Sequence, residues 1–223
     1  MNKIGIIIAD DAEFEPFLGL PGASVRDFYS CRGICFEYNK NKISAVHSGV
    51  GKVNAAAAAA HLISDEKPDF ILNAGFSGVV SGLRRGDFAA GKSYVECDFD
   101  ITATGRRPGE KPGQTYIYKA DERLLRAALS IEGVKSAALG TGDIFLTDKE
   151  KKEFYKKTFG INAFDMESAA IASVCFFAGV PFLSLRKISD DADDAALEDF
   201  REMSGKHEPD IMEILLKIID SLL

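Results

Sequence analysis

The sequence predicts an α/β protein in which a largely parallel sheet lies between layers of helices. Short runs of β-branched and other apolar residues recur along the chain, and each ends in a turn rich in glycine or acidic residues. Segments with helical character lie between these runs, and strands that alternate with helices are typical of parallel sheets covered on both faces. A chain of 223 residues, 46% of them hydrophobic, can bury one large core, so we expect a single domain over residues 1–223.

The first two predicted units each begin with a strand. Residues 3–9, KIGIIIA, predict a strand, residues 10–13, DDAE, a turn, and residues 14–20, FEPFLGL, a short helix. The second strand is KISAVHSGV at 42–50. The helix that follows, at 51–66, contains an unbroken run of alanines, which favour helix formation and allow close packing against a sheet.

Three further strands and a buried helix follow. The segment 68–80 is a short apolar run that ends in glycines, and 136–146 is typical of a strand with its loop. The small, apolar stretch from Ser168 to Phe177 predicts a buried helix, and 180–190 predicts a strand that runs into acidic residues.

Functional residues are expected where the strands end, because parallel sheets bind ligands outside the carboxyl ends of their strands. The residues there are Asp10, Asp11 and Glu13, Gly49 to Gly51, Gly75 to Gly78, Phe145 and Leu146, and Ser189 and Asp190. Carboxylates without neighbouring His or Cys suit general acid and base chemistry on a neutral ligand and disfavour a transition-metal site. The acidic residues after Asp190 are interpreted as a solvated loop.

The composition narrows the class of ligand. A net charge of -7 and a pI near 5.1 disfavour nucleic acid and anionic membranes, which require dense Lys and Arg, so we expect a small-molecule partner. The first apolar run is short and is interrupted by Asp10 and Asp11, so we expect no leader or anchor and a cytoplasmic protein. The four cysteines form no CxxC pair and only three histidines accompany them, so we expect reduced thiols, no metal and no cofactor.

Several segments carry a family resemblance. They are IGIIIADDAEFEPF, SGVGKVNAA, NAGFSG, GTGDIFL, FDMESAAIASVC and RKISDDAD. In this order, and over nearly the whole chain, they resemble the methylthioadenosine/S-adenosylhomocysteine nucleosidases of the nucleoside phosphorylase superfamily. The resemblance implies a three-layer αβα fold with a twisted, mixed and partly closed sheet, and a homodimer in which a neighbour completes each pocket. It also implies hydrolysis of the N-ribosidic bond of 5′-modified adenine nucleosides, with release of adenine.

The resemblance assigns roles to three carboxyl groups. Glu13 matches the acid that positions and activates water, Glu167 the one that holds the ribose hydroxyls, and Asp190 the one that protonates or hydrogen-bonds purine N7. These roles fit the chemistry, because breaking the bond builds positive charge on the sugar and negative charge on the base. An Asp holds a proton near neutral pH only if burial or neighbours raise its pKa. Asp165, two residues before Glu167, is expected to cap the helix instead.

The other expected site residues bind the substrate. Phe145 matches the ring that stacks on adenine, and Leu146 offers backbone contacts to the base. Met166 packs beneath the sugar, and Ser189 supports Asp190. The remaining positions that match the family's pocket are Val50, Phe76, Ser77, Arg186 and Phe200.

Two departures from the family's pattern concern the pocket. Phe76 stands where these nucleosidases usually have Ser, so a small polar contact is lost or shifted by one residue to Ser77. Thr104 and Arg106 stand where aromatic rings commonly line the site of the 5′ substituent. Either Arg106 and Arg107 both point into solvent, or one of them, for which we name Arg106, pairs with a carboxylate on the substrate's tail, because Arg recognises carboxylate through two parallel hydrogen bonds.

Other functions remain open at this point. A futalosine hydrolase would act on a nucleoside with a carboxylated tail, and a non-catalytic nucleoside-binding protein could keep the same scaffold. A nucleoside phosphorylase needs a cradle of Arg and Gly backbone N–H groups for phosphate, whereas the first loop here reads ADDAEFE and would repel the anion. A Rossmann dinucleotide enzyme is disfavoured, because IGIIIADDAEF lacks the GxGxxG turn.

Overall fold

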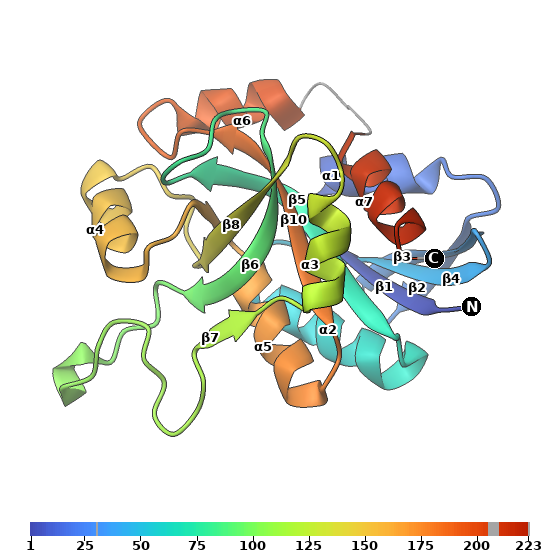
Figure 1. The fold of residues 1–223 in the computed structure, drawn as a ribbon, viewed down its shortest axis with the longest axis horizontal. Coiled ribbons are helices and arrows are strands. Elements are labelled where there is room, and N and C mark those ends of the chain that lie inside the picture. Colours follow the sequence, from blue (N-terminus) through green and yellow to red (C-terminus); the bar gives the residue numbers. More distant parts are fainter. Residues whose placement is uncertain (30, 205–209, 223) are drawn as a thin grey trace.

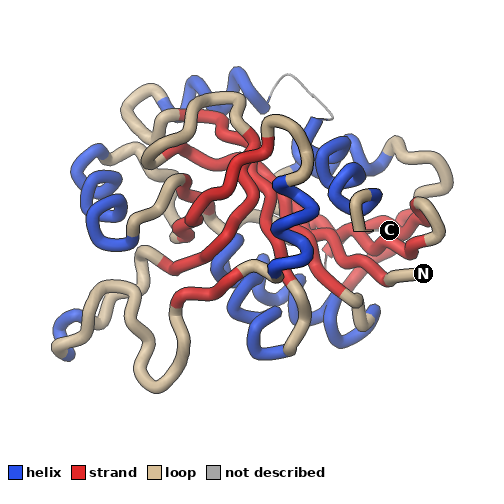
Figure 2. Tube along the Cα trace, viewed as in Figure 1, coloured by secondary structure: helices blue, strands red, loops and turns tan. Residues whose placement is uncertain are grey.

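The structure is a computed structural model that describes residues 1–29, 31–204 and 210–222. Within these ranges, a ten-stranded sheet lies between two layers of helices (Figures 1 and 2). The predicted three-layer α/β architecture is confirmed. None of the helices in the described part of the chain has the length and apolar character needed to cross a membrane.

The sheet is mixed and partly closed. Its strands are β1 (Lys3–Ile8), β2 (Ser24–Phe28), β3 (Cys31–Tyr38), β4 (Asn41–His47), β5 (Phe70–Val79), β6 (Phe88–Glu96), β7 (Ile117–Lys119), β8 (Val134–Thr141), β9 (Ala163–Asp165) and β10 (Phe182–Asp190). The strand order is β10-β6-β8-β9-β5-β1-β4-β3-β2, with β7 on β6. Because β10 also pairs with β5, the part from β5 through β9, β8 and β6 to β10 closes on itself. The strands β4, β1, β5 and β10 run parallel to one another.

Helices cover both faces of the sheet. One layer holds α1 (Asp11–Leu18), α3 (Glu122–Leu129) and α7 (Asp210–Asp220), and the other holds α2 (Lys52–Glu66) and α5 (Ser168–Ala178). The remaining helices are α4 (Lys149–Phe159), α6 (Ala196–Ser204) and the short 3₁₀ helix η1 (Thr102–Thr104). The alanines of α2 pack as predicted, because Ala55, Ala58 and Ala59 are buried against the sheet.

The predicted turn at 10–13 is wrong, because α1 begins at Asp11. Asp10 is the N-cap, and its Oδ1 accepts a hydrogen bond from the backbone N–H of Ala12 at 2.9 Å. The acidic residues Asp11 and Glu13 fill the first turn, where the positive end of the helix dipole favours negative charge. Glu13 therefore sits on a helix just beyond the end of β1.

Parallel pairing brings the ends of three strands to one edge. Ile8 at the end of β1 is opposite Ala74 of β5, and Gly78 of β5 is opposite Asp190 at the end of β10. All of β10 is buried, because other elements cover both of its faces. Residues at its end are therefore held rigidly beside the end of β5.

Candidate active site

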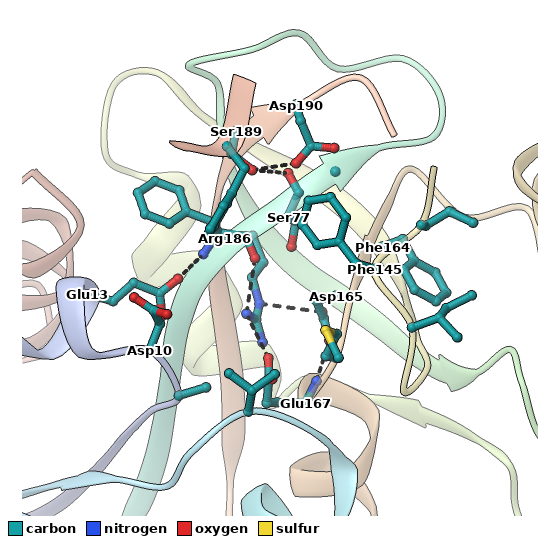
Figure 3. A pocket seen from close by; sticks show the side chains of 18 residues that line it. Asp10, Glu13, Ser77, Phe145, Phe164, Asp165, Glu167, Arg186, Ser189 and Asp190 are labelled. Atoms are coloured by element: carbon teal, nitrogen blue, oxygen red, sulfur yellow. Dashed lines mark hydrogen bonds and ion pairs between the residues drawn. The ribbon is translucent and has the colours of Figure 1, made fainter. Parts of the chain in front are cut away.

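A cavity of about 230 Å³ opens at the carboxyl ends of β1, β5 and β10 (Figure 3). The residues that line it are Ala9, Asp10, Glu13, Val50, Phe76, Ser77, Gly78, Ile144, Phe145, Leu146, Phe164, Asp165, Met166, Glu167, Arg186, Ser189, Asp190 and Phe200. They come from the strand ends, the first turn of α1, the loops after β4 and β8, the start of α5, and α6. Ligands of parallel sheets bind at this position.

Arg186 is the buried cation of the site, with 2% of its surface exposed. Its Nε lies 3.4 Å from Asp165 Oδ2, and its Nη1 lies 3.5 Å from Glu167 Oε2. It also donates to Asn73 Oδ1 at 2.5 Å and to Ser184 Oγ at 3.0 Å. Such a set of partners is required because a buried charge without them is strongly destabilising. The network fixes Glu167 in the cavity wall.

Asp165 caps α5, as the sequence predicted. Its Oδ1 accepts hydrogen bonds from the backbone N–H groups of Glu167 at 2.9 Å and of Ser168 at 2.8 Å, and its Oδ2 accepts one from Ser168 Oγ at 2.6 Å. The Glu167 side chain is therefore left to face the cavity, where its Oε1 accepts a hydrogen bond from Gly51 N–H at 3.0 Å. Burial raises the pKa of Glu167, and the positive charge of Arg186 opposes that rise.

Glu13 lies beside the same arginine. Its Oε1 accepts a hydrogen bond from the backbone N–H of Phe76 at 2.6 Å. Burial raises the pKa of Glu13 to about 8, although that hydrogen bond and Arg186 act in the opposite direction. Gly75 makes room for both groups, because a Cβ there would lie 2.8 Å from Arg186 Nη1 and 2.9 Å from Glu13 Oε1. A carboxyl group with this pKa holds a proton at neutral pH, and it becomes available as a base as the pH rises toward 8.

Asp190 occupies the opposite end of the cavity (Figure 3). Its Oδ2 accepts a hydrogen bond from Ser189 Oγ at 2.7 Å, and its Oδ1 accepts one from Ala192 N–H at 2.9 Å. Burial raises the pKa of Asp190, and these two hydrogen bonds lower it. Within the described residues no cation pairs with it, so burial dominates. A Cβ on Gly78 would lie 2.7 Å from Asp190 Oδ1, which explains the glycine.

Aromatic rings form one wall of the cavity. Phe145, which is 43% exposed, lies in the loop after β8, and its ring centroid is 5.8 Å from that of Phe200 on α6. The ring of Phe76 meets Phe200 edge to face at 5.9 Å. Beside it, the Oγ of Ser77 is buried and has no hydrogen-bond partner among the described residues. Ser77 therefore offers a free hydroxyl next to the rings.

Arg85 connects α6 with the end of β10. Its Nη1 lies 2.8 Å from Asp199 Oδ1 and its Nη2 lies 3.2 Å from Glu202 Oε2, both on α6. Its Nε donates to the backbone oxygen of Ser189 at 3.2 Å. Because Ala196 is the one fully buried residue described in α6, these contacts are important for holding the helix, and with it Phe200, over the cavity.

The structure brings together all the expected site residues except one. Those that line the cavity are Glu13, Val50, Phe76, Ser77, Phe145, Leu146, Met166, Glu167, Arg186, Ser189, Asp190 and Phe200. Arg106 does not, because it lies on the loop that carries η1 and projects away from the sheet (Figure 1), where its Nη1 pairs with Glu110 Oε1 at 3.0 Å. The expected contact between Arg106 and a substrate tail is therefore not made within one chain.

Some lining residues lacked a signal in the sequence. Ala9, Ile144 and Phe164 are apolar neighbours of the recognised segments, and nothing distinguishes them from core residues. Asp10 was expected at the rim without a role, and the structure places it in the cavity wall. Asp11, expected at the same rim, instead has 90% of its side chain exposed and lies outside the lining.

Comparison with protein families gives one match over nearly the whole chain. The model of the family described as "Phosphorylase superfamily" matches residues 3–220. The 5′-methylthioadenosine/S-adenosylhomocysteine nucleosidase of Geobacillus kaustophilus is 35% identical over 199 residues, which cover 82% of this chain and 85% of the relative. The enzyme of the same name from Actinobacillus succinogenes is 36% identical over 209 residues, which cover 90% of both chains.

Solved structures agree with the sequence relatives. A mutant of the Helicobacter pylori methylthioadenosine nucleosidase, with 5′-methylthioadenosine in its active site, superposes with a TM-score of 0.94 at 27% identity and covers 99% of both chains. The native futalosine hydrolase of Helicobacter pylori superposes with a TM-score of 0.93 at 28% identity and covers 98% of this chain and 97% of its own. The chain therefore belongs to the phosphorylase superfamily and, within it, to the family of 5′-methylthioadenosine/S-adenosylhomocysteine nucleosidases.

Proposed function

We propose that this protein hydrolyses the N-ribosidic bond of 5′-modified adenine nucleosides such as methylthioadenosine and S-adenosylhomocysteine, and releases adenine. One observation carries the proposal, namely the separation of carboxyl groups within one cavity. Asp190 lies at one end without a cationic partner among the described residues, whereas Glu167 at the other end lies beside Arg186. The sequence relatives and structural neighbours support the same reaction.

In the proposed reaction, the bond between C1′ of the ribose and N9 of adenine breaks, and its electron pair stays with the base. Asp190 gives a proton to N7, so adenine leaves as a neutral molecule. A water molecule attacks C1′ and Glu13 takes one of its protons, which yields a free ribose derivative. The raised pKa of Asp190 suits a proton donor, and the ionised form of Glu13, which gains population as the pH rises toward its pKa of about 8, is the form that accepts a proton from water.

The remaining contacts are proposed to hold the sugar and the base. Glu167 accepts hydrogen bonds from the ribose hydroxyls and places negative charge near the developing sugar cation. Met166 packs beneath the sugar. Phe145 stacks on adenine, which gives binding energy without using a polar group. Leu146 supplies backbone contacts to the base, and Ser189 supports Asp190 through the 2.7 Å hydrogen bond.

Water, and not phosphate, is the proposed nucleophile. Among the described residues that line the cavity, Arg186 is the one cation, and Asp165 and Glu167 already pair with it. Phosphate recognition needs free Arg side chains and backbone N–H groups. The carboxyl groups of Asp10 and Glu13 in the same wall disfavour a second anion.

A second candidate is a futalosine hydrolase, and the structural neighbour of that name favours it. Its substrate differs in the 5′ substituent, so both candidates use the same carboxyl groups. Measuring kcat/KM for methylthioadenosine and for futalosine distinguishes the two candidate functions, because the true substrate should give the higher value.

The test is release of adenine from methylthioadenosine in phosphate-free buffer, followed by chromatography of both products. We expect adenine and free methylthioribose, with rates that do not depend on added phosphate. If adenine appears only with phosphate and a ribose 1-phosphate accumulates, the nucleophile is phosphate and not water. If methylthioadenosine binds but no base is released, the protein is a nucleoside-binding protein.

We also propose that the protein is a single catalytic domain that acts as a homodimer in the cytoplasm, in methionine salvage. Apolar side chains exposed on α2, β7 and α5 support the dimer, and they are Val53, Ile117, Phe176 and Phe177. Val50, 47% exposed where the cavity meets this layer, links the apolar surface to the site. A second copy is also the route by which Arg106 can reach a pocket. Light scattering at micromolar concentration tests the dimer, and a monomer mass contradicts it.

A further inference from the structure

Asp10 is a carboxyl group in the cavity that the proposed chemistry does not use. It follows β1 directly, and its Oδ1 is engaged as the N-cap acceptor for Ala12 N–H at 2.9 Å. No hydrogen bond or ion pair among the described residues involves its second oxygen. Asp10 is partly exposed, and it lies close enough to Glu13 to raise the pKa of that group electrostatically. Asp10 therefore adds an acidic side chain to this wall of the cavity.

The sheet order shows which part of a bound nucleoside lies near Asp10. Asp190 ends β10, and β5, β1 and β4 follow it in order across the sheet. Val50 follows β4, and Asp10 follows β1. Neighbouring strands are about 4.8 Å apart, so Val50 and Asp190 lie about three spacings, or about 14 Å, from each other along the sheet edge. Figure 3 likewise shows Asp10 and Asp190 at opposite ends, with Arg186 between them.

A nucleoside whose base contacts Asp190 therefore directs its other end toward Asp10 and Val50. The sugar lies between, beside Glu167 and Arg186, and the 5′ substituent extends from the sugar away from the base. Val50 is 47% exposed, so this end is the mouth of the cavity and has room for a substituent. The charge of Asp10 then acts on the 5′ substituent.

That charge is not neutralised within the described part of the chain. Arg186 is the one cation that lines the cavity there, and it pairs with Asp165 and Glu167. Arg106, the residue expected to attract a carboxylate, lies outside the cavity and pairs with Glu110. An anionic tail meets like charge at Asp10, and an ammonium group meets opposite charge.

We propose that Asp10 selects substrates by the charge of the 5′ substituent, favouring a tail that carries an ammonium group and disfavouring one that carries only a carboxylate. This inference rests on the proposed function. A neutral methylthio tail is accepted, and a homocysteine tail can pair its ammonium group with Asp10. A tail with carboxylates alone, as in a futalosine hydrolase substrate, is disfavoured.

Three adenosine derivatives of nearly equal size test the inference. Their 5′ substituents are propylthio, 2-aminoethylthio and carboxymethylthio, which are neutral, cationic and anionic at pH 7. For wild type, we expect kcat/KM for the cationic probe to exceed that for the anionic probe by about tenfold to a hundredfold. In Asp10→Asn this ratio should fall to within about threefold, because Asn keeps the size and the cap acceptor of Asp10 but not its charge.

Asp11→Asn is the matched control, because it removes the same charge one residue away from a side chain that is 90% exposed and outside the cavity. Its ratio should equal that of wild type. The inference is overturned if Asp10→Asn keeps the wild-type ratio, or if Asp11→Asn changes it as much. Failure of wild type to release adenine even from the propylthio probe would instead contradict the proposed function.

Discussion

The two ends of the cavity hold the same kind of chemical group in different surroundings. At the end proposed to bind the sugar, Asp165 and Glu167 share the buried cation Arg186. At the end proposed to bind the base, Asp190 has a hydroxyl and a backbone N–H as partners, and no cation among the described residues. Glu167 and Asp190 are both buried, so the difference between the ends lies in the partners and not in exposure.

Burial raises the pKa of both Glu167 and Asp190, and at Glu167 the positive charge of Arg186 opposes that rise. A nearby cation favours the ionised form of a carboxyl group, whereas burial without a cation favours the protonated form. The sugar end is thereby suited to place fixed negative charge beside a sugar cation, and the base end to deliver a proton.

Removing the proton at the base end should have the largest effect. In Asp190→Asn the side chain keeps its size but has no proton to give, so we expect kcat for methylthioadenosine to fall by about a hundredfold to ten-thousandfold. The protein should stay folded, which circular dichroism checks beside the steady-state rates. Asp191→Asn, at the exposed next residue, is the matched control and should retain turnover. Near-normal turnover in the Asp190 variant would remove the acid from the mechanism.

Removing the cation at the sugar end should chiefly reduce stability. Arg186→Met leaves the buried carboxyl groups of Asp165 and Glu167 without their cation, so the free energy of unfolding should fall by about 3–5 kcal/mol. Urea unfolding at pH 8 and pH 5 measures the loss. The loss should be smaller at pH 5, because protonation neutralises the carboxylates left unpaired. Equal losses of stability at the two pH values would show that the loss does not come from breaking the ion pairs of Arg186.

Glu13 should make stability depend on pH. Its pKa in the folded protein is about 8 against an ordinary value of 4.5, so the folded protein keeps a proton that the unfolded chain releases. The stabilising contribution of this proton is complete below pH 4.5 and is lost as the pH rises to about 8. Glu13→Gln removes the loss, so at pH 9 the variant should be more stable than wild type by about 2–4 kcal/mol.

Denaturant unfolding of wild type and Glu13→Gln at pH 5 and pH 9 measures this effect. The variant should gain little at pH 5, where the wild-type side chain is already neutral. If the stability difference between the variant and wild type is the same at both pH values, the proton retained by the folded protein is not on Glu13.

The smallest effect is expected at α6. Arg85→Met removes the ion pairs to Asp199 and Glu202, so we expect KM to rise about twofold to fivefold with a smaller change in kcat, because exposed ion pairs contribute little each. Added salt should raise the wild-type KM toward that of the variant. Arg84→Met, at the exposed neighbouring residue, is the control. If salt raises KM equally in wild type and in Arg85→Met, Arg85 does not position the helix.

The place of Ser189 and Asp190 at the cavity was predictable from the sequence, for a physical reason. Ser189 and Asp190 end a continuous apolar strand, and in a parallel sheet that position lies at the ligand-binding edge. The Met-Glu pair at the start of α5 was identified through the family resemblance. In the structure, Asp165 accepts hydrogen bonds from the N–H groups of Glu167 and Ser168, which leaves the Glu167 side chain for another role. Features that depend on residues close together in the sequence can be predicted without knowledge of the tertiary contacts.

Some helices were missed although local signals mark them, because α3 and α4 begin with the side-chain caps Asp121 and Asp148. The hairpin of β2 and β3 and the helices α6 and α7 were also left unassigned. Other features depend on distant contacts and were not predictable. The α1 boundary moved because the cap is Asp10 and not a later residue, which put Asp10 into the cavity wall. Arg106 was assigned by its place in a loop, and sequence alone does not say whether a loop folds back over its own chain or projects away from it.

The central claim is that Asp190 protonates the base while Glu13 acts on water. A substrate whose leaving group needs no proton, 4-nitrophenyl 5-deoxy-5-methylthioriboside, separates the two roles. We predict that Asp190→Asn lowers kcat/KM by about a hundredfold or more for methylthioadenosine but by less than about tenfold for the nitrophenyl riboside, whereas Glu13→Gln lowers both by similar factors. A loss of equal size on the two substrates in Asp190→Asn would contradict the account.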